Sequence, residues 1–468
     1  MRARGICGKR ALIVALLATL FSASSAHAVD VKTLTLARGQ QVWFVSDHTL
    51  PMIALTAALP AGSAYDPPGK PGLASFAADL LDEGAGKLNS NAFQTALSNR
   101  AIRLSVSPDR DYLIVSLVTL SDNARDAFQL LGTALASPRF DQDAIARVRA
   151  QILSGMAQDD QDPSTVAAKG FARAFFHDHP YGHPVGGDEA GIAAIDAAAL
   201  KGFAATHWVG GGLKVAVAGD VDAATLGELL KSAFGDLPLR TPALLPPVFH
   251  EGTPGVQVIP MPVPQPTAVF GLPGLLRSDR EFVPAYVANY ILGGGGFSSR
   301  LMNEVRVKRG LTYDISTSLE FNRKAGFMLG DVASKRGGVK DTIGVIRDTL
   351  RDFAANGPTQ KELDDAKTYL TGSFPLAFGS NVGIAAQLNA FQRAGLTVDY
   401  VQKRNALINA VTLDQVAHAA KRLFNPAKLT IVVAGSLGEA VATPNPPSAA
   451  PLKSPPLKTA PGAPGPHH

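Results

Sequence analysis

Cysteine and charged residues are both scarce in this chain of 468 residues. Its single cysteine is Cys7, so no intramolecular disulfide can form and ordinary hydrophobic cores must hold the fold together. Charged residues make up 18% of the sequence and hydrophobic residues 46%, the usual balance of a soluble globular protein. The length exceeds what one compact core usually holds, so we expect two domains.

Residues 1–28 have the pattern of a cleavable signal peptide. Four basic residues lie within positions 2–10, an apolar stretch runs from Ala11 to Phe21, and Ala26-His27-Ala28 matches an A-x-A cleavage site. The apolar stretch is too short to span a bilayer comfortably, although an uncleaved anchor is the alternative. We therefore expect export to the periplasm, a mature chain that starts at Val29, and no stable membrane insertion.

Loss of this leader would change the charge of the protein. The leader carries four basic and no acidic residues, so its removal lowers the formal net charge from +5 to +1. It also removes Cys7 and leaves a mature chain without cysteine. A nearly neutral protein gives no electrostatic reason to expect a nucleic acid or an anionic membrane as its partner.

The rest of the sequence contains the same features twice. Each copy has an apolar run that ends in Leu-Pro, later an amphipathic helical pattern, and finally an apolar run that ends in glycine. The matching pairs are Leu59-Pro60 with Leu272-Pro273, 141–156 with 359–374, and 213–219 with 429–435, at offsets of 213, 218 and 216 residues. A further helical pattern follows each Leu-Pro, at 72–83 and 282–292. Such close offsets predict an internal duplication.

Each copy is therefore predicted to be an α+β lobe of roughly 200 residues, with an antiparallel-rich sheet covered by helices. We place the N-terminal lobe at 29–240 and the C-terminal lobe at 241–440, joined by the proline-rich segment 237–254. Residues 441–468 are mostly Pro, Ala, Ser and Gly, which predicts a disordered tail.

Several short motifs occur in a characteristic order. They are Pro71-Gly72-Leu73-Ala74, His179-Pro180-Tyr181-Gly182, Val185-Gly186-Gly187, Ala218-Gly219-Asp220, Ser299-Arg300-Leu301 with Glu304 and Arg306, Gly310-Leu311 with Tyr313, and Ala434-Gly435-Ser436. Together they resemble the pitrilysin/insulinase family of zinc peptidases, most closely the mitochondrial processing peptidase and its bacterial two-subunit relatives. The resemblance covers about residues 30–440 and implies two homologous lobes around a substrate chamber.

The zinc site of active members of that family has no counterpart in this sequence. In those members the helix after Gly-Leu-Ala carries H-x-x-E-H, whose two histidines bind zinc while the glutamate acts on its bound water. The corresponding positions are Ser75, Ala78 and Asp79, and the downstream glutamate ligand falls on Gly155. Residues 49–176 contain no histidine and residues 84–188 no glutamate, so a shifted alignment cannot restore the site. The resemblance implies no cofactor in this chain.

Two other clusters could suggest a metal site. His177, His179 and His183 lie close in sequence, but in a proline-containing loop where their rings need not converge. Three aspartates within 159–162 follow a helical segment, but they lack the spacing and the closing glutamate of a calcium loop. A structural loop and a solvated helix end are the favoured interpretations.

The glycine run formed by Gly293, Gly294, Gly295 and Gly296 could be mistaken for a phosphate-binding loop. It lacks the G-K-[ST] ending of a P-loop and the preceding strand of a dinucleotide site. The family resemblance implies instead a loop that faces the substrate chamber. We therefore predict that these four glycines contact substrate.

The second copy keeps two residues that the resemblance makes functional. A helix that begins at 298–299 and ends at Gly310 is predicted to carry Arg306 in its last turn. The strand predicted at 311–321 carries Tyr313. The resemblance implies that the arginine binds the substrate carbonyl and that the tyrosine stabilises the oxyanion. The residue pattern alone favours a surface cation stabilised by the helix dipole for Arg306 and a core aromatic for Tyr313.

A chain that lacks the zinc set but keeps Arg306 and Tyr313 resembles the complementing subunit of a heterodimer. Its homologous partner would carry H-x-x-E-H and zinc, and the two bowl-shaped subunits would enclose an unfolded peptide and hydrolyse its internal bonds. Alone, the chain should be inactive. One alternative is a non-catalytic structural or peptide-binding subunit, which has no chemical need for the two residues. A second is an independent metalloenzyme built on the histidine loop.

Overall fold

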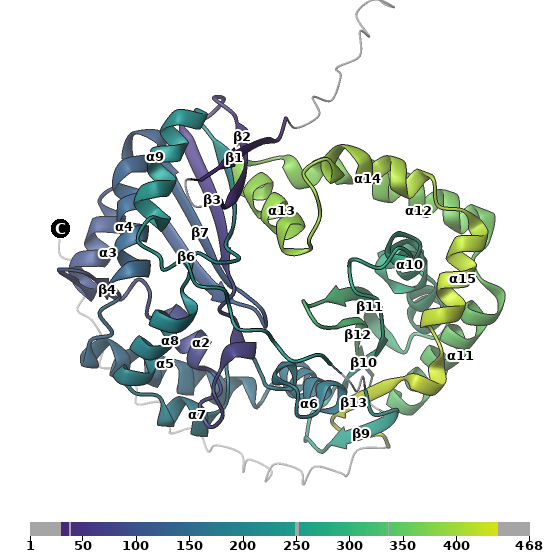
Figure 1. Ribbon diagram of the computed structural model, residues 1–468. Coiled ribbons are helices and arrows are strands. Elements are labelled where there is room, and N and C mark those ends of the chain that lie inside the picture. Colours follow the sequence, from purple (N-terminus) through teal and green to yellow (C-terminus); the bar gives the residue numbers. More distant parts are fainter. Residues whose placement is uncertain (1–29, 37–38, 249–251, 336, 439–468) are drawn as a thin grey trace, which may run out of the picture.

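The computed structural model describes residues 30–36, 39–248, 252–335 and 337–438. The predicted signal peptide and the predicted tail lie outside these ranges. The described residues form two lobes, each with a sheet and its own helices (Figure 1). Among them, no helix combines the length and the apolar character needed to cross a membrane.

The first lobe is built on a six-stranded sheet. Its strands are β1 (Lys32–Thr35), β2 (Gln41–Ser46), β3 (Met52–Leu59), β6 (Arg103–Pro108), β7 (Leu113–Leu120) and β8 (Lys214–Gly219). They lie in the order β1-β2-β8-β3-β7-β6, and every neighbouring pair is antiparallel except β2 with β8. A separate short hairpin pairs β4 (Gly84–Ala85) with β5 (Leu88–Asn89).

The helices of this lobe are α2 (Leu73–Asp79), α3 (Ser90–Ser98), α4 (Ala124–Ala136), α5 (Gln142–Asp159), α6 (Pro163–Phe176), α7 (Glu189–Ala194), α8 (Ala197–His207) and α9 (Ala223–Phe234), with short 3-10 turns η1 (Ser63–Tyr65), η2 (Ser121–Asn123) and η3 (Pro180–Gly182). α2 is shorter than the helix predicted at 72–83, because the chain turns at Leu80.

The second lobe has the strands β9 (Gly255–Ile259), β10 (Thr267–Pro273), β11 (Thr312–Phe321), β12 (Gly326–Ser334) and β13 (Thr430–Ala434). Its α-helices are α10 (Phe282–Asn289), α11 (Val339–Asn356), α12 (Gln360–Gly372), α13 (Asn381–Arg393), α14 (Tyr400–Asn409) and α15 (Leu413–Leu423). Two π-helical segments, η4 (Tyr290–Gly294) and η6 (Met302–Val307), and the 3-10 turns η5 (Gly296–Ser298), η7 (Phe374–Phe378) and η8 (Pro426–Lys428) complete it.

The two sheets repeat one topology. The order β2-β8-β3-β7-β6 in the first lobe corresponds to β9-β13-β10-β12-β11 in the second. In both, the first pair is parallel and the remaining pairs are antiparallel. This confirms the prediction of two homologous α+β lobes with antiparallel-rich sheets. The extra strand β1 distinguishes the first lobe.

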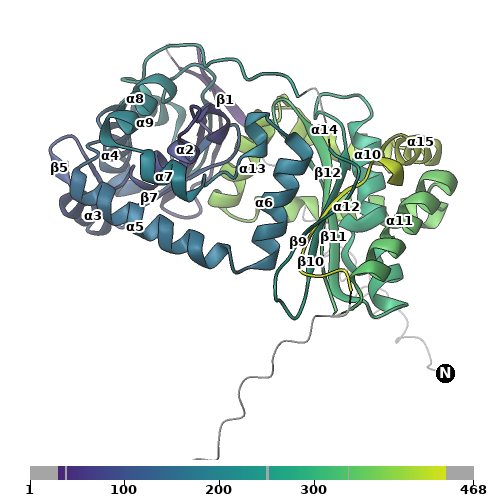
Figure 2. The same cartoon turned by 90° about the horizontal axis from the view of Figure 1, so that it is seen from below.

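Each lobe sends one helix onto the sheet of the other lobe. α13 packs on β3 and β8, and α6 packs on β10 and β13 (Figures 1 and 2). The two helices follow α12 and α5 at equivalent places in the two copies. Each central strand is therefore covered on both faces, which explains why these strands are apolar almost without interruption.

Successive side chains along a strand point to opposite faces of the sheet, so each central strand contributes to two cores, one with the helices of its own lobe and one with the helix from the other lobe. In β8, Val215 and Val217 lie in the core formed with helices of their own lobe, whereas Ala216 and Ala218 pack with Leu388 of α13. The small alanines allow α13 to approach the sheet closely. The buried amide of Asn389 adds hydrogen bonds from Nδ2 to the carbonyl oxygens of β3 and β8, at 3.2 and 3.1 Å.

The contact of α6 with the second sheet also depends on a residue without a side chain. Phe171 and Phe175 of α6 share a core with Val432 of β13. A Cβ atom at Gly170 would lie 2.7 Å from Cδ1 of Ile259 and 2.9 Å from Cγ1 of Val432, closer than van der Waals contact. Gly170 therefore lies at a close contact between α6 and the second lobe.

Gly170→Leu should destabilise the protein by about 1–3 kcal/mol, because the added side chain must push α6 away from β13. The matched control is Gly344→Leu on α11, where an added Cβ meets no atom within 4 Å. We expect the control to be at least as stable as the wild type, by up to about 1 kcal/mol, because glycine is unfavourable inside a helix. Chemical denaturation followed by circular dichroism measures both. Equal stabilities of the two variants would contradict close packing of α6 on the second sheet.

Candidate functional site

α2, which carries the positions of the zinc motif, is held in place at its first residues. The carboxylate of Asp66 accepts hydrogen bonds from the backbone N–H groups of Gly72 and Ala74, both at 2.7 Å. Gly72 has a φ of +93°, and a Cβ there would lie 2.6 Å from the carbonyl oxygen of Gly186. Burial raises the pKa of Asp66 to about 7, although both N–H donors favour its charged form.

The motif positions on α2 do not fit a zinc ion. Ala78 is 3% exposed and lies in the hydrophobic core, and Ser75 is half-buried. Asp79 reaches the surface, yet partial burial of its carboxyl group, with the nearby charge of Asp82, raises its pKa to about 6. A methyl group, a hydroxyl and one carboxyl group do not replace two histidines and a glutamate.

The position of the third ligand, Gly155, lies on the exposed surface of α5, where a Cβ would meet no atom within 4 Å. Arginines fix α5 against α2 instead. The guanidinium of Arg147 forms a two-pronged ion pair with Glu83, at 2.9 and 2.6 Å. The guanidinium of Arg149 lies 5.5 Å from the ring centroid of Phe76. Within the described part of the chain, no three His, Cys, Asp or Glu side chains are grouped so that they could hold a metal.

The three histidines of the loop after α6 do not converge. Nδ1 of His179 accepts a hydrogen bond from the backbone N–H of Tyr181 at 3.1 Å, and its Nε2 donates to the carbonyl oxygen of Pro246 at 3.0 Å. His177 lies 3.4 Å from the Thr253 hydroxyl, and His183 is exposed. His179 thus uses both ring nitrogens to fix the loop, and burial lowers its pKa.

Sequence reasoning missed a Ser-His-Asp arrangement at the end of β2. Nε2 of His48 lies 3.1 Å from Oγ of Ser46, and its Nδ1 lies 2.6 Å from Oδ1 of Asp220. The Ser46 hydroxyl, however, donates its proton to the carbonyl oxygen of Val221 at 2.8 Å, so the histidine does not act as its base. The side chain of His48 is also 64% exposed. The cluster ties together the ends of β2 and β8.

The glycine run lies on the π-helical segment η4 and the turn after it. Gly293 is buried, and a Cβ there would lie 2.3 Å from the Thr317 hydroxyl of β11. Gly294 and Gly296 are exposed and Gly295 is half-buried. Gly293 thus lets η4 lie close to β11, and the role of the four glycines in substrate binding stays a prediction.

Arg306 lies on η6, which is π-helical rather than the α-helix predicted from 298–299. The Ser299 hydroxyl accepts a weak hydrogen bond from the Met302 N–H, at 3.4 Å. η6 ends at Val307, and Gly310, with a φ of +59°, closes the turn that follows it. The Arg306 guanidinium stacks on the ring of Phe297, 4.5 Å from its centroid. No carboxylate among the described residues pairs with it. π-helical turns often occur at functional sites.

Tyr313 is an exposed residue, so its interpretation as a core aromatic is wrong. Its side chain is 79% exposed. The pairing of β11 with β12 shifts register between Thr312 and Ile315, so Tyr313 and Asp314 form a β-bulge. The Thr312 hydroxyl braces this bulge: it accepts from the Asp314 N–H at 3.1 Å and lies 2.7 Å from the carbonyl oxygen of Ala333.

Comparisons with known proteins agree with this two-lobed fold. Residues 42–189 match the model described as Insulinase (Peptidase family M16), and residues 194–370 match Peptidase M16 inactive domain. The crystal structure of a peptidase M16 inactive domain from Pseudomonas fluorescens superposes with a TM-score of 0.83 at 30% identity, over 88% of this chain and 99% of that one. The chain belongs to peptidase family M16.

Other M16-like proteins are also similar to this chain over most of its length. The non-peptidase homolog YmxG of Helicobacter pylori is 27% identical over 409 residues, which is 86% of this chain and 93% of that protein. An uncharacterized zinc protease of Streptomyces coelicolor is 26% identical over 426 residues, 86% of this chain and 92% of that protein. The crystal structure of a protease from Helicobacter pylori shares the fold, with a TM-score of 0.79 at 18% identity, over 87% of this chain and all of that one.

As an M16 member, this chain keeps the fold of the family. Ser75, Ala78, Asp79 and Gly155, at the positions where the family resemblance predicts the zinc ligands and the base, offer one carboxyl group among them. The packing of Ala78 and the Arg147–Glu83 pair hold the α2–α5 region together without a metal.

The purified chain, kept apart from other proteins, should hold no stoichiometric zinc, since its motif positions offer only one carboxyl group. Elemental analysis after dialysis against a weak chelator measures the zinc content. A content of about one zinc per chain would overturn the expectation. The triple variant His177→Ala, His179→Ala, His183→Ala would then locate or exclude the histidine loop as its source.

Proposed function

We propose that this chain is the zinc-less subunit of a heterodimeric M16 metalloendopeptidase, exported to the periplasm. Its partner would be a homologous chain that carries H-x-x-E-H and zinc. In this proposal the two chains together enclose a peptide substrate, and Arg306 and Tyr313 act in the partner's active site.

The exposure of Tyr313 is the observation that carries the proposal. A large aromatic side chain that is 79% exposed adds little to the stability of its own chain. Its hydroxyl has no hydrogen-bond partner in the described structure. Because the bulge in β11 projects it outward, it is free to contact a second molecule. Exposed tyrosines of this kind frequently anchor interfaces and ligands.

Arg306 supports the same role. Stacking on Phe297, itself 67% exposed, restricts the side chain while its N–H donors stay free. A guanidinium offers two parallel donors to the oxygens of a peptide or carboxylate. An ordinary surface arginine that balances a helix dipole has no need of such a support.

The chemistry follows from the change in charge during peptide hydrolysis. As water attacks the carbonyl carbon, negative charge develops on the carbonyl oxygen, and zinc in the partner would supply the Lewis acid. A phenol donates a hydrogen bond that strengthens as this charge develops. Arg306 would act earlier, by fixing the peptide backbone through its donors.

A non-catalytic peptide-binding subunit is the second candidate, and the sheet edges favour it. β6 and β11 occupy equivalent outer positions, and each pairs with a neighbour on one side only. A free strand edge can pair with an extended peptide through main-chain hydrogen bonds. Such binding needs neither Arg306 nor Tyr313, so variants at these residues separate the two candidates.

Tyr313→Phe should lower kcat of the reconstituted complex on the order of 10²–10³-fold, because it removes one donor to the developing oxyanion. Zinc content and assembly should not change. Tyr369→Phe is the matched control, since Tyr369 is also exposed, at 59%, but lies on α12. Steady-state kinetics on a fluorogenic peptide measure both. Wild-type rates for Tyr313→Phe would exclude its part in catalysis and favour the peptide-binding subunit.

Arg306→Ala should reduce kcat/KM, with part of the loss in KM, because its donors would already bind the substrate before the transition state. Arg351→Ala is the control, as Arg351 is 63% exposed on α11. The same peptide assay measures both variants. An unchanged kcat/KM for Arg306→Ala would remove this residue from the proposed site.

Mixing this chain with an H-x-x-E-H homologue exported by the same cell should give a 1:1 complex, because neither chain alone closes the chamber. Stable interfaces bury on the order of 1,200 Å² or more, so the complex should persist at micromolar concentrations. Light scattering coupled to size-exclusion chromatography measures the mass. Two separate monomers in the mixture would contradict the heterodimer.

A further inference from the structure

The seam between the lobes contains a groove that the proposed chemistry does not use. Two adjoining cavities, of about 960 and 640 Å³, share the lining residues Gly212, Lys214, Gln392 and Gly395. We call them the cationic end and the Trp43 end of the seam groove, after the charge of the first and the aromatic residue that lines the second. Residues of both lobes line each end.

Basic side chains outnumber acidic ones at the cationic end. The lining holds five basic residues, Arg110, Lys214, Arg277, Arg323 and Arg393, and three acidic ones, Asp109, Asp111 and Glu320. One ion pair joins the two sets among the described residues, Arg393 with Asp109 at 2.8 Å. Both carboxylate oxygens of Asp111 are already used, by the Tyr181 hydroxyl at 2.5 Å and by the backbone N–H of Arg323 at 2.8 Å. The excess positive charge therefore lacks an anion.

Donors at this end also lack acceptors. Among the residues that the structure describes, no acceptor lies within hydrogen-bond distance of Nε of Arg393 or of Nδ2 of Asn322, although both atoms are buried. The guanidinium of Arg277 lies over the rings of Phe282 and Tyr400, at 4.4 and 5.1 Å, and contacts no carboxylate in the described structure. Buried donors without partners are costly, so a ligand that accepts hydrogen bonds here would be stabilised.

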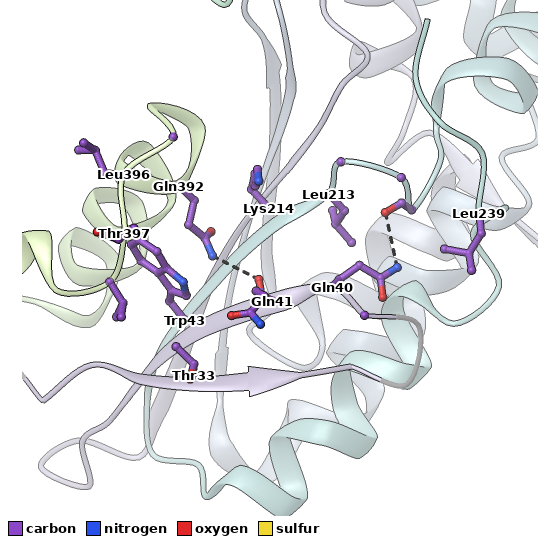
Figure 3. Close-up of a pocket in the computed structure, with 16 residues that line it drawn as sticks. Thr33, Gln40, Gln41, Trp43, Leu213, Lys214, Leu239, Gln392, Leu396 and Thr397 are labelled. Carbon is purple, nitrogen blue, oxygen red and sulfur yellow. Dashed lines mark hydrogen bonds between the residues drawn. The ribbon is translucent and has the colours of Figure 1, made fainter. Parts of the chain in front are cut away.

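At the Trp43 end, whose lining residues are drawn in Figure 3, hydrogen-bond acceptors lack donors. Gln392 is 5% exposed, and its Nε2 donates to the carbonyl oxygen of Gln41 at 3.3 Å. Nε2 of Gln40 donates to the carbonyl oxygen of Gly210 at 3.5 Å. Because these bonds fix which way each amide points, the Oε1 atoms of both glutamines are left buried without donors. Both oxygen atoms have almost no accessible surface, so each amide must rotate slightly toward the groove before an N–H group of a ligand can donate to it.

The geometry points to one kind of occupant. We propose that the seam groove binds the carboxyl-terminal segment of a peptide, with its carboxylate at the cationic end and its backbone N–H groups at the Oε1 atoms of Gln40 and Gln392. A carboxylate matches the fork of the guanidinium donors. A peptide amino terminus carries the wrong charge for this end. The proposal rests on the proposed function in naming a peptide, but the groove lies within this chain alone.

Calorimetric titration of the full chain, without a partner, tests this with N-acetylated penta-alanine as the free acid and as the carboxyl-terminal amide. We expect the acid to bind at least tenfold more tightly than the amide. Its binding should also change the emission of Trp43, which is buried but lines the groove; the other tryptophan, Trp208, lines neither end of it. Equal binding of acid and amide, or no binding of the acid at millimolar concentration, would overturn the proposal.

Two variants locate the site. Asn322→Ala should weaken binding of the acid several-fold without changing the unfolding midpoint, because the amide nitrogen it removes has no partner to lose. Arg393→Gln should weaken it further, and Arg125→Gln on α4 should leave it unchanged. Wild-type affinity in both Asn322→Ala and Arg393→Gln would place the peptide elsewhere and refute the groove.

Succinate and inorganic phosphate distinguish a peptide from a free anion. If the groove binds a peptide terminus, neither should compete with the acid at equal concentration, since neither supplies N–H groups to the glutamines. Competition at equal concentration would make the groove a small-anion site and would refute the peptide. None of these measurements involves Tyr313 or a partner, so their failure and the failure of the heterodimer are separate results.

Discussion

The reciprocal exchange of α6 and α13 is the constraint on which the rest of the structure depends. Each sheet is covered on one face by helices of its own lobe and on the other by the exchanged helix. Without the exchange, a row of apolar strand residues in each lobe would face water, at about 25 cal/mol per Å² of apolar surface. Neither lobe is therefore expected to be stable alone, and the angle between the lobes is fixed by packing rather than by the segment that links them.

The exchange also determines what meets at the seam. Because α13 lies along the first sheet, it carries Gln392 and Arg393 to the β6–β7 turn that holds Asp109. The β11–β12 turn reaches the same place, where Arg323 contacts Asp111 and Tyr65 at 2.8 Å each. The hydrophobic packing of α13 on the first sheet thus brings polar loops of both lobes together. The charge and the unpartnered polar atoms of the seam groove are consequences of how the lobes interlock.

The sequence predicted the features that repeat locally and missed those that cross between lobes. The Leu-Pro endings of β3 and β10 and the glycine after β8 and β13 located equivalent strands, because strand length and turn residues are local signals. The packing of Phe171 on Val432 joins residues far apart in sequence. The apolar pattern of α6 does not indicate which sheet the helix covers, so this contact could not be predicted. Gly170 beside three phenylalanines was the available sign of a close contact.

The same limit applied to the candidate site. The predicted absence of zinc ligands and the candidates Arg306 and Tyr313 both came from the order of motifs that the chain shares with the family. The exposure of Tyr313 depends on one extra residue in β11 relative to β12, and such a bulge has no signature in this stretch of sequence. The roles of His179 and His48 depend on partners from distant loops, Pro246 and Asp220, which spacing cannot reveal.

The residues at the predicted zinc positions of the first lobe and Tyr313 of the second lobe differ in what they contribute to stability. In the first lobe, Ala78 of α2 is buried in the core and Glu83, just after α2, pairs with Arg147 of α5, so both residues contribute to the packing of this region. In the second lobe, the Thr312 hydroxyl braces a bulge that interrupts the ladder and turns an aromatic ring outward. That arrangement gives up a regular strand pairing and leaves Tyr313 in water. In the proposed heterodimer, a substrate held by the partner would cover the ring and accept its hydrogen bond.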